Sequence, residues 1–147
     1  VKLEIKQKQG AAQTKKSLLI SKNLAEEMIC GRYGGLMEID SELSMAFYQL
    51  LEAGVYRPKC IVEYHRTAFV EESNDIRITL DSEIGTSCNC EDFFRNDLSL
   101  LPVRKEPMLE VKYNGFLLSN IKQILDYTDA SELAISKYMI SRQIMGI

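Results

Sequence analysis

The stretch Lys59–Ser82, KCIVEYHRTAFV-EESN-DIRITLDS, decides the fold. Two runs rich in β-branched and aromatic residues, 59–70 and 75–82, flank the polar segment 71–74, and this pattern predicts a β-hairpin. Successive side chains of a strand point to opposite faces. One face of the first strand therefore carries Val62, Tyr64, Arg66 and Ala68. One face of the second carries Arg77, Thr79 and Asp81.

Two further strand-like segments carry a glutamate and a lysine two residues apart, which places both side chains on one face. They are Leu3-Glu4-Ile5-Lys6 and Leu109-Glu110-Val111-Lys112. A carboxylate suits a hard cation and an ammonium suits phosphate oxygens, so each pair fits a site that holds a metal ion and a polyanion together. The alternative is a solvated ion pair worth ~0.5 kcal/mol.

The rest of the chain predicts strands and short helices. Residues 1–8 form a strand, 10–14 a turn and 17–20 a second strand that follows Lys15-Lys16. Ser21 caps a helix that ends near Gly31, and 31–35 is a loop. Asp40 or Ser41 caps an amphipathic helix that ends at Gly54, and its apolar stripe faces the core. A helix capped by Ser119 covers 120–126, and Ser136-Lys137-Tyr138 opens or sits in the last helix.

Size, charge and cysteine content narrow the class of protein. A chain of 147 residues with 46% hydrophobic residues predicts one domain over 1–147, without a signal peptide or a membrane segment. Net charge is −3 and no window is strongly basic, so we expect no nucleic-acid partner, and any anion-binding cations must gather on an inward face. We expect the four cysteines to be free thiols in a cytoplasmic protein, rather than a metal or redox pair of Cys88 and Cys90 with His65.

The order of the motifs resembles a known family. Along the chain these motifs are Glu-x-Lys, Lys-Lys, Tyr64-His65-Arg66-Thr67-Ala68-Phe69, Arg77-Ile78-Thr79-Leu80-Asp81, Glu-Val-Lys-Tyr and Ser-Lys-Tyr. The set resembles the catalytic domain of the vacuolar transporter chaperone (VTC) complex and its bacterial relatives. Those domains are polyphosphate polymerases of the triphosphate tunnel metalloenzyme superfamily.

The resemblance implies an α+β fold, an antiparallel β-barrel that encloses a tunnel, with helices packed outside. The family's basic Arg-x-Arg strand has no match in this sequence. The chain therefore looks like the C-terminal part of the domain, with an incomplete tunnel. Such a piece is expected to self-associate, because exposed strand edges pair, or to carry bound anions such as sulfate or phosphate. It is also expected to have negligible polymerase activity alone, because the upstream cations are absent.

The resemblance also implies residue roles. Lys6, with Lys15 or Lys16, would bind phosphate. Arg66 and Arg77 would bind the nucleotide triphosphate or the growing chain, and Glu110 would coordinate Mn²⁺ or Mg²⁺ beside Lys112. Ser136 and Lys137 would complete the phosphate site. The catalytic set is then Arg66, Arg77, Lys112 and Lys137. Without the resemblance, Arg66 and Arg77 would be interpreted as surface residues in cross-strand pairs, and Ser136 as a helix cap.

The implied function is metal-dependent transfer of the γ-phosphate of ATP onto polyphosphate. Phosphoryl transfer depends on positioned cations more than on acid–base groups, which suits a chain with one histidine. The alternative is a non-catalytic module that binds polyphosphate or phosphate. Tunnel enzymes that hydrolyse triphosphates or cyclise ATP normally carry Glu-x-Glu-x-Lys, whereas Lys2 stands in the first glutamate position here.

Overall fold

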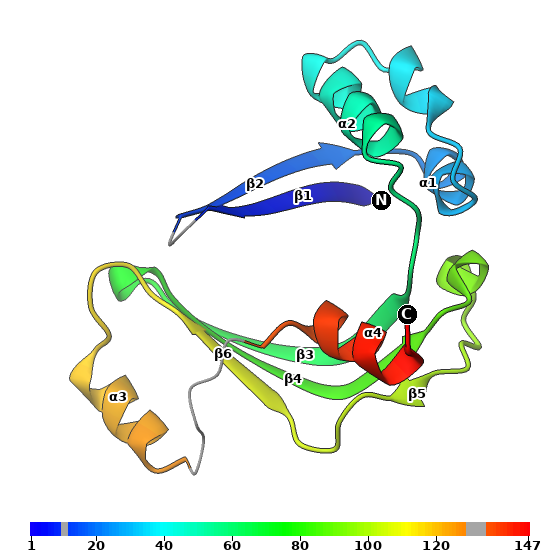
Figure 1. Ribbon diagram of the computed structural model, residues 1–147. Helices are drawn as coiled ribbons and strands as arrows, with labels where there is room; N and C mark the ends of the chain where they lie inside the picture. The colour runs from blue at the N-terminus through cyan, green and yellow to red at the C-terminus, as the bar shows by residue number, and fades with distance from the viewer. Residues whose placement is uncertain (10–11, 129–134) are drawn as a thin grey trace. The chain divides into compact units, whose positions relative to one another are not determined.

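The computed structural model describes residues 1–9, 12–128 and 135–147 (Figure 1). The chain divides into two compact units. The first comprises Val1–Lys59 with Cys90–Phe94, and the second comprises Cys60–Asn89 with Arg95–Ile147. The expectation of a single domain over 1–147 stays a prediction.

The first unit begins with an antiparallel hairpin of β1 (Lys2–Gln9) and β2 (Ala12–Leu19). Glu4 lies opposite Ser17, and Lys6 lies opposite Lys15. The strand predicted over 17–20 thus starts earlier, and Lys15 and Lys16 lie inside it. The hairpin packs against the core through Leu3, Ile5 and Leu18. Only the face of the hairpin that packs on the core needs apolar residues. The strand β2 can therefore include the mostly polar stretch 12–14, which the sequence pattern assigned to a turn.

Helices cover the rest of the first unit. In α1 (Lys22–Ile29), Ser21 caps the N-terminus and its Oγ accepts a hydrogen bond from the Leu24 amide at 3.1 Å, which confirms the predicted cap. In α2 (Glu42–Ala53), Ser41 is the N-cap residue and Gly54 the C-cap residue. The predicted loop 31–35 is wrong in part, since Gly34–Glu38 forms a short 3₁₀-helix. Another 3₁₀-helix covers Cys90–Phe94.

The core of the first unit forms where the helices meet the apolar face of the hairpin. Its buried members are Ile20, Ala25, Met28, Tyr33, Leu36 and Phe47. Phe47 is fully buried, and Leu43 and Leu51 of the same helix pack around this cluster. The apolar stripe of α2 therefore contributes to the core, as predicted, although Ala46 of that stripe is exposed.

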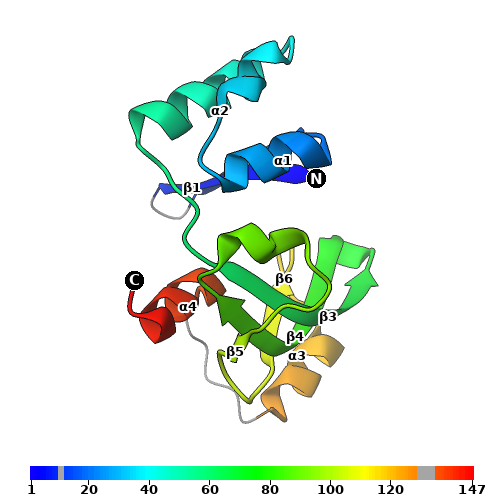
Figure 2. The same cartoon turned by 90° about the vertical axis from the view of Figure 1, so that its right-hand side faces the viewer.

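The second unit is built on a four-stranded antiparallel sheet with β4 (Ile76–Ser87) at its centre. On one side β4 pairs with β3 (Ile61–Glu71), which confirms the predicted hairpin. On the other side it pairs with β5 (Leu101–Pro102) and β6 (Met108–Lys112). A 3₁₀ turn at Ser73–Asp75 joins the hairpin, and α4 (Lys137–Met145) packs on β3 and β4 (Figure 2).

A β-bulge explains why β4 runs to Ser87 and does not end at the predicted Ser82. His65 pairs with Ser82 but Glu63 pairs with Gly85, so Glu83 and Ile84 both lie opposite Tyr64. Glu83 adopts a φ of 52°. The extra residue breaks the alternation of period two that marked the strand in the sequence, while pairing resumes beyond it.

The expected α+β class with antiparallel strands is confirmed. Among the described residues the sheets are open and do not close into a barrel, so the tunnel stays a proposal. The helix α3 (Ser119–Asp126) has Leu118, not Ser119, at its N-cap position. No helix in the described ranges combines the length and the apolar character that a membrane crossing needs. The four cysteines are free thiols, as expected.

Candidate functional site

The register of the second unit aligns charged residues on one face of its sheet. Arg66 of β3 lies opposite Asp81 of β4. On the other side of β4, Arg77 lies opposite Lys112 and Thr79 lies opposite Glu110 of β6. Directly opposite residues share a face. The "cationic face" is defined here as Tyr64, Arg66, Arg77, Thr79, Asp81, Glu110 and Lys112, together with Lys137 of α4.

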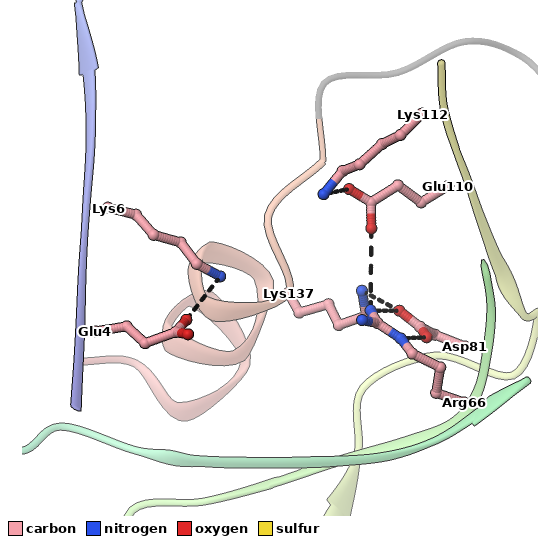
Figure 3. A network of polar contacts seen from close by, with 7 residues as sticks. All are labelled: Glu4, Lys6, Arg66, Asp81, Glu110, Lys112 and Lys137. Atoms are coloured by element: carbon pink, nitrogen blue, oxygen red, sulfur yellow. Dashed lines mark hydrogen bonds and ion pairs between the residues drawn. The ribbon is translucent and has the colours of Figure 1, made fainter. Parts of the chain in front are cut away.

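Asp81 organises this face. Its side chain has no exposed surface, and the guanidinium of Arg66 donates to it twice, Nε to Oδ1 at 2.6 Å and Nη2 to Oδ2 at 2.7 Å (Figure 3). Lys137 Nζ reaches Oδ2 at 2.5 Å. The hydrogen bonds from Arg66, and then Lys137, lower the pKa of Asp81 and outweigh its desolvation. The same contact raises the pKa of Arg66. Asp81 therefore stays ionised and fixes two cations.

Tyr64 holds the same two cations from another direction. The centre of its ring lies 5.0 Å from the guanidinium carbon of Arg66 and 5.0 Å from Lys137 Nζ. Both distances are within the range of a cation–π interaction. The sequence interpretation assigned no role to Asp81 or Tyr64. The available signal was strand alternation, which placed Tyr64 with Arg66 and placed Asp81 with Arg77.

The other cations of the face are more exposed. Glu110 pairs with Lys112 at 3.1 Å and approaches Arg66 Nη2 at 3.9 Å. Arg77 is exposed, and no ion pair of Arg77 occurs within the described part of the chain. It lies directly opposite Lys112, and like charges in that position destabilise a sheet. Four cations and two carboxylates thus share the face, which leaves a positive excess.

Ser136 stands next to Lys137 and caps α4. Its Oγ accepts a hydrogen bond from the Met139 amide at 3.4 Å. The helix-cap interpretation is confirmed, and a contact of Ser136 with phosphate stays a prediction. By capping this helix, Ser136 also fixes the turn from which Lys137 reaches Asp81.

The VTC domain family model matches residues 1–146. The chain belongs to the VTC domain family. No curated protein sequence and no solved structure matches the chain. The predicted resemblance to VTC domains is therefore confirmed, and the matched range includes every residue of the cationic face.

The first unit of the VTC domain has its own cluster of lysines around Glu4. Lys15, Lys2 and Lys6 lie 2.7, 3.4 and 3.9 Å from its carboxylate oxygens. The hydrogen bond from Lys15 is the main cause that lowers the pKa of Glu4. Lys16 lies opposite Ile5, on the face that packs against the core. Among the predicted phosphate ligands, the hairpin therefore brings Lys6 and Lys15 together and leaves Lys16 on the other face.

Glu110 is the candidate metal ligand of the VTC domain. No group of three His, Cys, Asp or Glu side chains able to hold a metal occurs in the described ranges. Asp81 is already engaged by Arg66 and Lys137. Mg²⁺ is commonly bound by one or two carboxylates, with waters and substrate phosphates as its other ligands. Glu110 therefore fits a metal that arrives together with phosphate, not one held by the protein alone.

Proposed function

We propose that this VTC domain serves a phosphotransferase that transfers the γ-phosphate of ATP onto a polyphosphate chain, with Mn²⁺ or Mg²⁺. The observation that carries the proposal is the pair of exposed, directly opposed cations Arg77 and Lys112, beside two further cations fixed on Asp81. Because Asp81 and Glu110 neutralise only two of its four cations, the face favours an anionic ligand. The cationic face extends across the three strands β3, β4 and β6. A polyphosphate suits it because every unit of the chain has a negative charge.

The geometry suits phosphoryl transfer. Charge in the transition state lies on phosphoryl oxygens, and preorganised cations stabilise it. Arg66 and Lys137 are held in place by Asp81 and Tyr64, whereas Arg77 and Lys112 are exposed, and Lys112 is paired only with the exposed carboxylate of Glu110. The acceptor is a terminal phosphate that is already anionic, so no general base is needed. A metal bound with Glu110 would neutralise phosphate charge.

The proposal extends to the tunnel of the family. A chain with a net charge of −3 nevertheless gathers four of its 18 lysine and arginine residues on one face of a sheet, as the inner wall of a basic tunnel requires. In the other unit, Lys6 and Lys15 are a second candidate contact for polyphosphate. Their common partner Glu4 holds them on one face of the β1–β2 hairpin.

One observation favours the alternative, a module that binds polyphosphate without turnover. Glu110 is the one carboxylate of the cationic face that is not buried, and it is engaged by Lys112 and Arg66. If it does not release these cations to bind a metal, the face binds polyphosphate but does not catalyse transfer.

Polyphosphate synthesis from ATP by the full-length protein, with Mg²⁺ or Mn²⁺, tests the proposal. We expect Arg77→Ala to lower the rate about 100-fold, as the loss of one transition-state contact does. The matched control is Arg95→Ala, since Arg95 pairs with Asp97 outside the cationic face. An unchanged rate in Arg77→Ala would reject the assignment. Tight binding of polyphosphate without synthesis by the wild type would establish the binding module instead.

A further inference from the structure

A buried hydroxyl on the cationic face has no hydrogen-bond partner in the described part of the chain. Thr79 is 3% exposed, and its Oγ1 has no hydrogen-bond partner among the described residues. Buried hydroxyls in folded proteins are nearly always hydrogen-bonded, because an unpaired one has lost its water without compensation. A neighbour that changes position would give Thr79 its partner in another state of the site.

That neighbour is Glu110. It lies directly opposite Thr79 in the register, and the Cβ atoms of such a pair are about 5 Å apart. The Glu110 carboxylate nevertheless turns to Lys112 at 3.1 Å and Arg66 at 3.9 Å (Figure 3). These are two of the cations assigned to phosphate. Glu110 and phosphate would therefore compete for the same two cations.

We propose that Glu110 competes with phosphate for Arg66 and Lys112, and that Thr79 binds the Glu110 carboxylate once phosphate has displaced it. When phosphate oxygens bind to Arg66 and Lys112, the Glu110 carboxylate turns and accepts a hydrogen bond from Thr79 Oγ1. A displaced carboxylate beside phosphate is repelled unless a donor stabilises it, and a hydrogen bond to a charged acceptor is among the stronger ones. Thr79 is then a positioning residue. The inference rests on the proposed function in one respect, that the face binds phosphate.

Calorimetric titration with tripolyphosphate in metal-free buffer tests this exchange, with Glu110→Ala, Thr79→Val and the double variant. We expect Glu110→Ala to bind about fivefold more tightly, because the competing ion pairs are gone. Thr79→Val should bind about fivefold more weakly, because the displaced carboxylate loses its donor. In the Glu110→Ala background, Thr79→Val should have no effect. Glu106→Ala, which removes an exposed carboxylate paired with Arg104, and Thr67→Val are the matched controls.

The outcomes separate the two proposals. Equal weakening by Thr79→Val in both backgrounds would mean that Thr79 contacts the anion itself, and would overturn the exchange. An unchanged affinity in Glu110→Ala would overturn it while binding by the wild type still supports the proposed function. Absence of binding in every variant would overturn both. Without tripolyphosphate, Thr79→Val should keep the unfolding midpoint of the wild type, because its hydroxyl bonds to none of the residues that the structure describes.

Discussion

At the scale of single residues, the cationic face depends on one buried carboxylate. Asp81 has two cationic partners, and Tyr64 contacts the same two cations. Arg66 and Lys137 therefore contribute to stability as well as to any ligand contact. Arg77 has no such partner in the described part of the chain, so its charge remains for a ligand. Residues with the same predicted role in phosphate binding thus differ in what they do for the fold.

This difference predicts unequal effects of two arginine substitutions. Arg66→Ala should lower the free energy of unfolding by about 2 kcal/mol, because Asp81 stays buried with Lys137 as its remaining cation. Arg77→Ala should change it by less than about 0.5 kcal/mol. Urea denaturation of both variants measures this. Equal losses of stability would show that Asp81 does not depend on Arg66.

The residue roles could be predicted from the sequence only in part. Alternation placed Arg66 with Tyr64 and Arg77 with Asp81, and it placed His65 on the opposite face, as the pairing of His65 with Ser82 confirms. It gave no register between strands. The opposition of Arg66 to Asp81, and of Arg77 to Lys112, therefore appeared only in the structure.

At the scale of elements, strong local signals predicted well. The polar segment 71–74 between two β-rich runs gave the hairpin, and Ser21 and Ser136 gave two helix starts. The bulge at Glu83 was not predicted, because period-two alternation identifies a strand only while it is unbroken. The two-residue strand Leu101–Pro102 carries no periodicity at all.

The start of α4 allows the cap to be separated from a phosphate contact. Ser136→Ala should lower the free energy of unfolding by about 1 kcal/mol, because the Met139 amide loses its acceptor. Ser136→Asp keeps a capping carboxylate, so stability should be retained while tripolyphosphate is repelled. Denaturation and calorimetric titration of both variants measure this. If Ser136→Asp binds tripolyphosphate as the wild type does, Ser136 is a cap and nothing more.

At the scale of the whole molecule, charge distribution matters more than net charge. The chain is acidic overall, yet cations outnumber carboxylates on one face of the β3–β4–β6 sheet. Composition could exclude a broadly basic surface but could not locate this face, because its residues come from β3, β4, β6 and α4 and are spread along the sequence from Tyr64 to Lys137.

The most direct test of phosphate binding by the cationic face is an NMR titration of the ¹⁵N-labelled chain with tripolyphosphate. If the cationic face binds phosphate chains, saturable shifts should appear at the amides of Arg77, Thr79 and Lys112 and at the Nε–H of Arg66. Unshifted signals at these four positions, with changes confined to Lys2, Lys6 and Lys15, would contradict it and assign phosphate binding to the β1–β2 hairpin.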